Sequence, residues 1–404
     1  MSTSLTTQLV HHAYRAPGGF EAVAPAVHKA STVFFGNVDE LRHREWRDKS
    51  GYTYGLHGTP TTFTLEERIA TLEGGKHCVL VPSGLAAVSL VDMAFLRQGD
   101  EMLVPDNAYV PNKSFAEAEL KAWGITTRYY DAMNPADLAT QLSDATRLVW
   151  LEAPGSVTLE FPDLPALVAV VAQANQQRTA NGKANPRPVL TALDNTWGAG
   201  IAFNGFELGA DMCMQALTKY PSGGADVLMG SVVTRDPALH HALLMTHMRL
   251  GHGVSGNDAE LVLRGLPSVE LRYHAQDAAT RQLATWMQTR PEVAQVLHPA
   301  LAGSPGHESW QRDARAAACL FSVVFRPHIS QRQIDRFCDA LQFFRLGWSW
   351  AGPISLCAPY DIPSMRQCAW PHAGGLVRFA IGLESVADLQ ADLTQALAVM
   401  ADNG

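Results

Sequence analysis

The chain has 404 residues, of which 47% are apolar and 17% are charged, a composition typical of a globular protein that is long enough for two or three domains. The formal net charge of −8 and the lack of a basic patch argue against a nucleic-acid partner. Residues 1–19 contain no basic region followed by an apolar core, and no run of about 18 apolar residues occurs, so we expect neither a signal peptide nor a membrane span but a cytoplasmic protein.

Residues 1–60 show no strong periodicity, and we expect them to form an arm that is ordered by packing on another surface. A helix is predicted from Thr62, with Thr62 or Thr64 as its cap and Gly74-Gly75 as its end. Strands and helices then alternate, with strands expected at 77–82, 101–105, 126–130, 147–151, 188–193, 211–218 and 230–234, and helices at 85–97, 112–123, 135–142 and 164–177. This alternation predicts a mostly parallel sheet that helices cover on both faces. The polar residues 176–188 are expected to form an exposed connection.

The pattern turns helical from Pro237 onward. A long helix is predicted over 258–290, with a break near Gly265-Leu266-Pro267. Strands at 319–325 and 376–381, with helices at 331–344 and 385–400, predict a smaller α+β part. The predicted fold class is therefore α/β, with an N-terminal arm over residues 1–60, a large domain over 61–265 and a small C-terminal domain over 266–404.

Residues that follow the strands are the candidate site, because ligands bind beyond the carboxyl ends of the strands in an open parallel sheet. Ser83-Gly84-Leu85 opens a helix whose free N–H groups could bind a phosphate, although a plain N-cap by Ser83 explains the same residues. Tyr109 follows the next strand and could lie flat on a planar ligand or simply be a core or surface tyrosine. Ser156, in a turn-rich segment, could lie beside a ligand.

Three charged residues at strand ends add to this pattern. Asp194 needs a positive partner such as a protonated pyridine nitrogen, unless it only caps the next turn. Lys219 follows the apolar run 212–217, and a desolvated lysine amine is a nucleophile that forms Schiff bases, although most such lysines are solvated. Arg378, in a strand-like run, needs a carboxylate from a substrate or from an internal salt bridge. In this order, the residues predict a site for pyridoxal 5′-phosphate.

Long, specific stretches extend from Tyr54 to the C-terminus: YGLHGTPTTFTLEERIATLEGG, LEAPGSVTLE, LDNTWGAG, QALTKY, HPALAGSPGHESWQRD, WSWAG and VRFAIGLE. They resemble the Cys/Met-metabolism family of fold-type-I pyridoxal-phosphate enzymes, and within it the bacterial cystathionine β-lyases. The resemblance implies that Lys219 forms the Schiff base with the cofactor and removes the substrate's α-proton. It also implies that Asp194 pairs with the pyridinium, and that Tyr109 stacks on the ring and helps deprotonate the incoming amine.

The resemblance implies further roles around these three residues. Gly84, Leu85, Thr218 and Ser156 would contact the cofactor, and Tyr54 would reach it from a neighbouring subunit. The substrate would be a small amino acid, with Ser349 and Arg378 on its α-carboxylate and Trp348 and Trp350 beside it. The family typically forms homotetramers, which are dimers of dimers with shared active sites.

Two positions favour β-elimination of cystathionine to homocysteine, pyruvate and ammonia, a step of methionine biosynthesis. Ser156 stands where the γ-acting members usually carry Asn, and Trp348 stands where γ-acting synthases tend to carry Glu. Leu56 departs from the family, which usually has a phosphate-binding Arg there, and the adjacent His57 could substitute in part. A γ-synthase, γ-lyase or sulfhydrylase, a cysteine or cystine β-lyase, and a non-catalytic binding protein remain alternatives.

Overall fold

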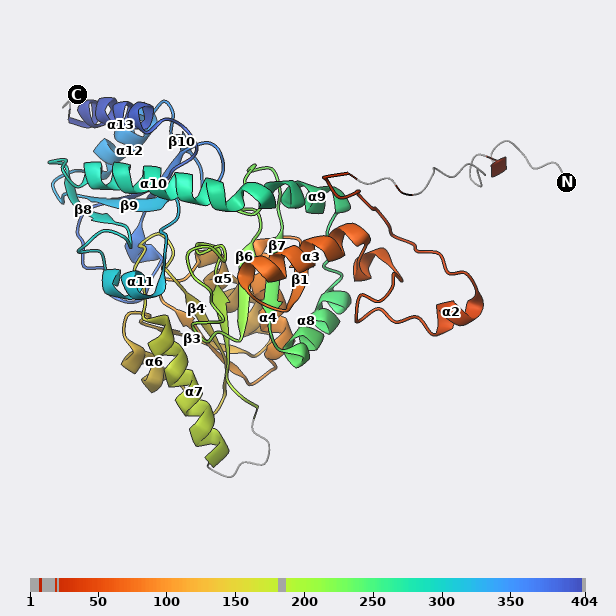
Figure 1. Ribbon diagram of the computed structural model, residues 1–404. Coiled ribbons are helices and arrows are strands. Elements are labelled where there is room, and N and C mark those ends of the chain that lie inside the picture. The colour runs from red at the N-terminus through yellow and green to blue at the C-terminus, as the bar shows by residue number, and fades with distance from the viewer. Residues whose placement is uncertain (1–6, 9–18, 20–21, 181–186, 402–404) are drawn as a thin grey trace.

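The computed structural model describes residues 7–8, 19, 22–180 and 187–401, and contains two sheets (Figure 1). Most of residues 1–19, for which we expect no signal peptide, lie outside these described residues. The larger sheet has the strand order β1-β7-β6-β5-β4-β2-β3. Its strands are β1 His77–Val81, β2 Glu101–Pro105, β3 Thr126–Tyr130, β4 Thr146–Glu152, β5 Leu190–Asp194, β6 Met212–Ala216 and β7 Gly230–Thr234. Strands β3, β2, β4, β5 and β6 are parallel and only β7 runs against its neighbours, which confirms the mostly parallel sheet.

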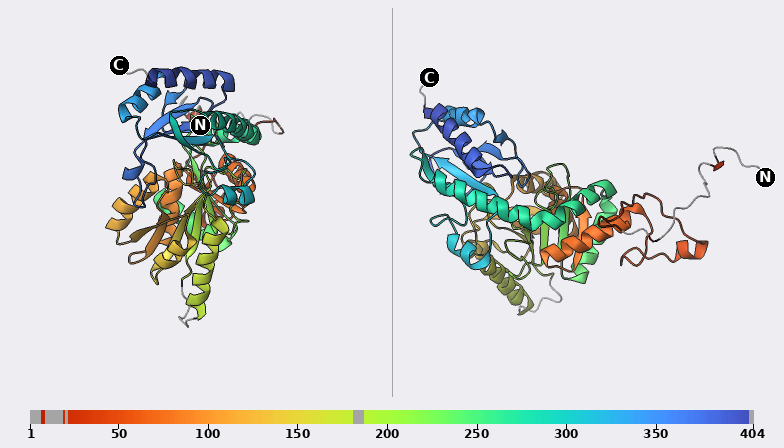
Figure 2. Two further views of the ribbon diagram at one scale, coloured as in Figure 1. Left: turned by 90° about the vertical axis from the view of Figure 1, so that its left-hand side faces the viewer. Right: turned by 45° about the horizontal axis from the view of Figure 1, so that its top comes forward.

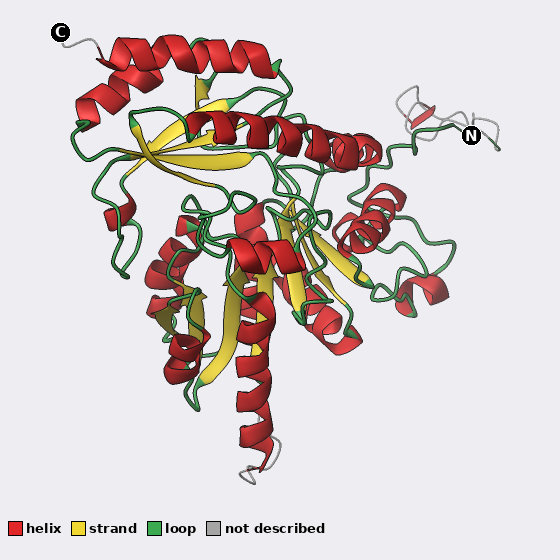
Figure 3. Ribbon diagram, turned by 60° about the vertical axis from the view of Figure 1, so that its left-hand side comes forward, coloured by secondary structure: helices red, strands yellow, loops and turns green. Residues whose placement is uncertain are grey.

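Helices cover both faces of this sheet (Figure 3). They are α3 Pro60–Glu73, α4 Gly84–Phe95, α5 Val110–Phe115 with the π-helical turn Ala116–Leu120, α6 Pro135–Gln141, α7 Leu164–Ala180 and α8 Pro237–Leu250. The strands alternate between two cores: in β1, Cys78 and Leu80 pack in one core, and Val79 and Val81 pack in the other. The strands that alternate in this way lie between two helical layers, and their ends remain available to bind a ligand.

Three sequence predictions about helix ends are wrong, one of them for the helix predicted over 331–344, which ends at Ala340. Helix α3 begins at Pro60, not Thr62, because Thr59 and Thr62 form a reciprocal capping box and proline suits the first helical position. Its end is as predicted, since Gly74 adopts a left-handed conformation there. Helix α7 continues to Ala180, so residues 176–180 are helical although their polarity predicts a connection; glutamine, arginine and alanine are all good helix formers.

The C-terminal half builds the second sheet, of order β10-β11-β12-β9-β8. A helix with the predicted break leads into it: α9 Gly256–Gly265, a 3₁₀ turn Leu266–Ser268 and α10 Val269–Met287. Its strands are β8 Val293–Leu297, β9 Leu320–Phe325, β10 Arg345–Leu346, β11 Leu356–Tyr360 and β12 Leu376–Ala380, with helices α11 His307–Asp313, α12 Gln331–Ala340 and α13 Val386–Ala401. Of these elements, β8, β10, β11 and α11 are not predicted from the sequence.

The two sheets lie next to each other, with α10 running along the second sheet and toward the first (Figures 1 and 2). The segment that carries α2 Val38–Arg42 extends away from both sheets, and an isolated bridge between Thr32 and Tyr54 and a 3₁₀ turn Gly55–His57 lie between it and α3. In the described part of the chain, no helix combines the length and the apolar character needed to cross a membrane. Contacts between the sheets bring residues at the carboxyl ends of strands in the larger sheet close to β11 and β12. Asp106, just after β2, for example, accepts a hydrogen bond from Gln367 in the connection between β11 and β12.

Candidate active site

Lys219 lies in a tight turn just beyond β6. The backbone N–H of Lys219 donates to Ala216, and the N–H of Gly223 donates to Lys219, which closes the turn. The side-chain Nζ donates to Ser349 Oγ at 2.8 Å and lies 5.4 Å above the ring of Trp350. Burial, and then the charge of Arg378, lower the pKa of Lys219 to about 8, so part of this amine is neutral and nucleophilic near physiological pH.

Asp194 ends β5, with its Oδ1 accepting a hydrogen bond from the N–H of Thr196 at 2.9 Å. Burial raises the pKa of the Asp194 carboxyl, and hydrogen bonds from Thr196, followed by the charge of Lys219, partly offset this. Within the described residues Asp194 forms no salt bridge, and its direct neighbour in register on β4 is another acid, Glu152. A carboxylate in this position is incompletely neutralised by the chain and suits a cationic ligand atom.

Tyr109 stands next to this acid pair. Its N–H donates to Glu152 Oε2 at 2.8 Å, while its side chain is 41% exposed. Burial raises the pKa of the Tyr109 phenol, followed by the charges of Asp194 and Glu152. Glu152 is a site residue that the sequence reasoning missed, although its position at the end of β4, beside the strand that ends in Asp194, is a signal for it. The exposed ring of Tyr109 is available to stack on a planar group.

The predicted phosphate site lies at the first turn of α4. Ser83 caps this helix, with its Oγ accepting from the N–H of Ala86 at 3.0 Å, so the plain N-cap exists. A Cβ on Gly84 would lie 2.7 Å from the Cβ of Ala216, so only glycine lets this turn rest on the end of β6. The N–H groups of Gly84 and Leu85 lack partners within the helix, as in any first turn. The turn therefore presents free donors beside the residues that lead to Lys219.

Thr218 is held more firmly than expected. Its backbone N–H donates to the carbonyl oxygen of Met229 at 3.2 Å, its hydroxyl also donates to that oxygen, and the N–H of Met229 donates to its Oγ1 at 3.1 Å. A phosphate would have to take over one of these bonds, so Thr218 can be a phosphate ligand only by exchange.

Arg378 lies on β12 with 7% of its surface exposed. Its Nη2 donates to the carbonyl oxygen of Ser349 at 3.4 Å, and its guanidinium lies 5.2 Å from the centre of the Tyr360 ring. Its Nε is buried without a hydrogen-bond partner. No acidic side chain in the described ranges forms an ion pair with Arg378, so the internal salt bridge that the sequence leaves open does not occur there. A buried guanidinium with an unused donor suits a bound carboxylate.

Aromatic side chains surround Arg378 and Ser349. Trp348 stacks on Tyr360 with ring centres 6.5 Å apart and is 74% exposed, and Trp350 contacts Lys219. Tyr360 is a second site residue that the sequence reasoning missed, because it ends β11, a strand that is not predicted. The hydroxyl of Ser349 faces the lysine while its backbone carbonyl accepts from Arg378, so Ser349 joins the two cations.

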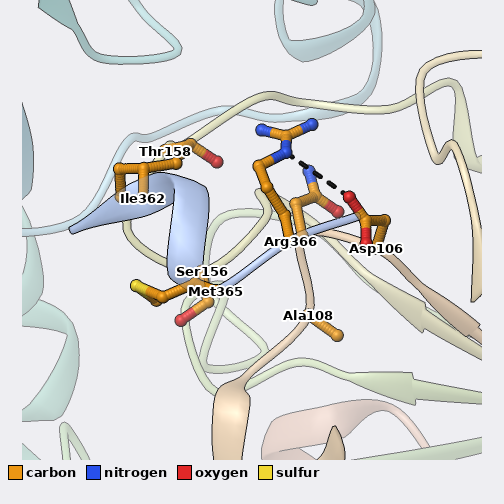
Figure 4. Close-up of a pocket in the computed structure, with 8 residues that line it drawn as sticks. Asp106, Ala108, Ser156, Thr158, Ile362, Met365 and Arg366 are labelled. Atoms are coloured by element: carbon orange, nitrogen blue, oxygen red, sulfur yellow. Dashed lines mark ion pairs between the residues drawn. The ribbon is translucent and has the colours of Figure 1, made fainter. Parts of the chain in front are cut away.

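Two further predicted residues, Ser156 and Tyr54, belong to other segments of the chain. Ser156 lines a small cavity together with Asp106 and Arg366 (Figure 4). Tyr54 is 45% exposed and lies in the N-terminal segment. His57, next to Leu56, stacks on Trp46 with ring centres 4.6 Å apart and contacts Thr53 Oγ1 through Nδ1 at 2.8 Å.

These residues fit pyridoxal 5′-phosphate. The unpaired Asp194 carboxylate matches a pyridinium, the exposed Tyr109 ring matches the pyridine plane, and the first turn of α4 offers N–H donors for the phosphate. The unused Nε of Arg378 matches the carboxylate of an amino acid. No described group of three or more histidine, cysteine or acidic side chains is arranged to hold a metal ion.

Comparison with known proteins supports the same cofactor. The family of Cys/Met metabolism PLP-dependent enzymes matches residues 6–398. The chain is 35% identical to cystathionine β-lyase MetC of Escherichia coli, over 96% of this chain and 97% of that protein. It is 38% identical to the cystathionine β-lyase of Bordetella avium, over 91% and 90%.

The solved structures agree with the sequence comparison. Cystathionine γ-synthase of Xanthomonas oryzae has a similar structure, with a TM-score of 0.83 and 29% identity over 95% of each chain. The predicted α/β fold and the predicted cofactor are thus confirmed. The chain belongs to the Cys/Met metabolism PLP-dependent enzymes.

Proposed function

We propose that the chain catalyses the β-elimination of cystathionine to homocysteine, pyruvate and ammonia, a step of methionine biosynthesis in the cytoplasm. One observation carries this proposal: Lys219 Nζ lies 2.8 Å from Ser349 Oγ, and Arg378 Nη2 lies 3.4 Å from the carbonyl oxygen of the same serine. An amino acid whose carboxylate pairs with Arg378 then has its α-carbon near the lysine amine. The names of the relatives in Escherichia coli and Bordetella avium support cystathionine as the substrate.

Pyridoxal 5′-phosphate, when bound, withdraws electrons from the α-carbon of an amino acid and makes its proton acidic. We assign the pyridine nitrogen to Asp194 and the ring face to Tyr109. Gly84 and Leu85 would bind the phosphate through their N–H groups, and Thr218 would bind it by exchanging one of its bonds with Met229. Ser156 stays a proposed neighbour of the cofactor: its N–H donates to the carbonyl oxygen of Asn107, and its backbone also hydrogen-bonds Glu152, the neighbour of Asp194 in register.

Lys219 moves the proton in this scheme. Its pKa of about 8 leaves part of the amine neutral near pH 7, and Ser349 Oγ orients Nζ. Nζ accepts the α-proton and then donates it to the departing sulfur, so the lysine ends as it began. The raised pKa of Tyr109 keeps its phenol protonated. Tyr109 can therefore take a proton from the incoming amine only when a nearby positive charge lowers that pKa.

Trp348 favours cleavage at the β-carbon. Its ring stacks on Tyr360 beside Arg378 and offers no acid or base for proton transfer at the γ-carbon. The similarity to a γ-synthase structure keeps a γ-acting enzyme as the second candidate. The two candidates differ in their products, since γ-cleavage releases 2-oxobutyrate in place of pyruvate.

We also propose a homotetramer, a dimer of dimers, in which Tyr54 of the arm over residues 1–60 reaches the site of a neighbouring subunit. The exposure of Tyr54 and the extension of its segment away from both sheets support this (Figure 2). The division into a large domain over 61–265 and a small domain over 266–404 is part of the same proposal.

The test is a product analysis of the purified protein with cystathionine and, separately, with cystine. We expect pyruvate and homocysteine from cystathionine, and we expect Lys219→Ala to abolish both. Release of 2-oxobutyrate, or synthesis of cystathionine from an O-acyl-homoserine, would show that the protein catalyses a γ-reaction and not β-elimination. A protein that retains the cofactor but converts none of these amino acids would refute a catalytic role in this pathway.

A further inference from the structure

The connection between β11 and β12, residues 361–375, joins two residues of the candidate site, because Tyr360 precedes it and Arg378 follows it closely. This connection leaves its own sheet and packs against the end of β2. Asp106, the residue just after β2, accepts hydrogen bonds from the N–H groups of Gln367 at 2.7 Å and Cys368 at 2.8 Å. The connection is therefore held by the larger sheet.

A cluster of four buried charges lies at this junction. Arg366 Nε lies 3.4 Å from Asp106 Oδ2, an ion pair without a hydrogen bond that Figure 4 marks with a dashed line beside the small cavity. Lys113 Nζ lies 3.6 Å from Asp106 Oδ1 and donates to the carbonyl oxygen of Met365 at 2.7 Å. Arg366 Nη1 also lies 3.1 Å from Glu160 Oε1. We call Asp106, Lys113, Glu160 and Arg366 the Asp106 cluster; its two acids and two bases balance.

The Asp106 cluster belongs to both halves of the site. Asp106 stands three residues before Tyr109, and Glu160 closes the loop that carries Ser156 and accepts from Asn107 Nδ2 at 2.7 Å. Only Arg366, on the 361–375 connection, comes from the C-terminal sheet. The cluster thus ties the residues around Tyr109 to the connection between Tyr360 and Arg378.

Stability alone is a weak explanation for these charges. Burying ion pairs costs desolvation energy that their attraction often barely repays, and apolar residues of the same volume can stabilise a fold equally well. Charge pairs do differ from apolar contacts in direction, because their hydrogen bonds are satisfied in only one geometry. Such a cluster is suited to holding one arrangement of the two sheets.

We propose that Asp106 and Arg366 are positioning residues, whose ion pair fixes the 361–375 connection, and with it Tyr360 and Arg378, relative to the strand end that carries Tyr109. The proposal rests on the proposed function in one respect, that Arg378 binds the carboxylate of the substrate. The loop of Tyr109 is also held from its own sheet, since its N–H donates to Glu152. Loosening the connection should therefore weaken substrate binding and leave cofactor binding intact.

The test compares Arg366→Met with the charge-balanced double variant Asp106→Asn/Arg366→Met in the holoenzyme, using whichever amino acid the wild-type protein converts. We expect KM to rise about tenfold in both, equivalent to about 1.4 kcal/mol, with kcat changed by less than about twofold because the reacting groups remain. The double variant should raise KM at least as far as the single one, because Asp106→Asn also removes one of the two acceptors for the N–H groups of Gln367 and Cys368. The affinity of the apoprotein for pyridoxal 5′-phosphate should stay within about twofold of wild type, since the cofactor residues are held separately.

Arg312→Met is the matched control. Arg312, in α11, also bridges the two halves, with Nη2 2.8 Å from Asp163 Oδ1, but on the exposed surface. Its loss should leave KM unchanged. Arg366→Lys, which keeps the charge, should recover part of the wild-type KM and covers the case in which Arg366→Met does not fold.

An unchanged KM in the Arg366 variants would overturn the proposal. A rise in KM that is accompanied by weaker binding of pyridoxal 5′-phosphate would also overturn it. So would an equal rise in KM in Arg312→Met. Because wild-type products are identified first, failure of β-elimination shows in the wild-type protein, whereas failure of the positioning role shows only in the variants.

Discussion

Glu73 is a buried acid whose replacement should stabilise the protein. It is the last residue of α3, 1% exposed, and forms no salt bridge with any described residue. Asn195 Nδ2 donates to it at 2.8 Å, and the side-chain amide of Gln215 donates to its other oxygen. The amide oxygens of Asn195 and Gln215 are buried without partners. Burial, with a smaller contribution from the charge of Asp194, raises the pKa of Glu73 from its ordinary 4.5 to about 8.

The sign of the effect follows from proton binding. Between the two pKa values the folded chain keeps the Glu73 proton and the unfolded chain has lost it, so the contribution of Glu73 to stability is complete below pH 4.5 and is lost as pH rises toward 8. The loss is about 1.4 kcal/mol per pH unit. Glu73→Gln mimics the protonated acid at every pH, and its new N–H₂ can donate to one of the two unpartnered amide oxygens. Relative to wild type, it should gain about 2 kcal/mol between about pH 6 and 7.5.

Urea unfolding of the apoprotein at both pH values, at one protein concentration, measures this difference. Glu73→Leu is the control: it removes the acid but leaves two buried amide N–H₂ groups without acceptors, which costs about 1–3 kcal/mol each at any pH. The reasoning is refuted if the advantage of Glu73→Gln does not grow with pH, or if Glu73→Gln is as unstable as Glu73→Leu.

Three further predictions concern cofactor binding. Asp194→Asn should weaken the affinity of the apoprotein for pyridoxal 5′-phosphate at least about tenfold, because the pyridinium loses its charged partner; an unchanged affinity in a fluorescence titration would contradict this assignment. Gly84→Ala should lower that affinity as well, since its Cβ would lie 2.7 Å from the Cβ of Ala216, and adding Ala216→Gly should restore it, whereas a steric clash elsewhere would leave the double variant weak. The rate of cofactor uptake should increase with pH and level off above about 8, because only the neutral Lys219 amine is a nucleophile; a rate that is flat from pH 6 to 9 would argue against this pKa.

The larger sheet could be predicted because most of its strands are buried on both faces and read as short apolar runs between turn residues. Strands β2 and β3 occur at the predicted residues. Candidate site residues that follow strands of this sheet, such as Tyr109 after β2 and Asp194 at the end of β5, could be found because ligands bind beyond the carboxyl ends of parallel strands. The local pattern was sufficient for this half of the site.

The rest depends on contacts that no local pattern encodes. Tyr360 was missed with β11, whose sequence LCAPY is short and contains proline. Glu73 meets Asn195 and Gln215 across 122 and 142 residues, and Asp106 meets Gln367 across 261. In isolation, Glu73 reads as an exposed acid at a helix end, and Asp106 reads as a turn residue. Glu73 gains its partners only when α3 packs on the larger sheet, and Asp106 gains Gln367 only when the two sheets pack together.

The pairing of charges separates two kinds of residue in this site. Burial moves the pKa of Lys219 and Arg378 down and that of Asp194 and Glu152 up, each toward its neutral form, so the folded chain holds these four groups at a cost.

Asp106 is the opposite case. Burial alone would raise its pKa, but the N–H groups of Gln367 and Cys368 and the charge of Lys113 outweigh it and lower the pKa. Charges that the chain satisfies by itself can fix geometry but have little left to offer a ligand. Charges that the chain leaves unpaired gain most when a pyridinium and a carboxylate arrive. Ion pairing therefore separates the proposed binding residues Asp194 and Arg378, which form no ion pair in the described part of the chain, from the proposed positioning residues Asp106 and Arg366, which pair with each other, with Lys113 and with Glu160.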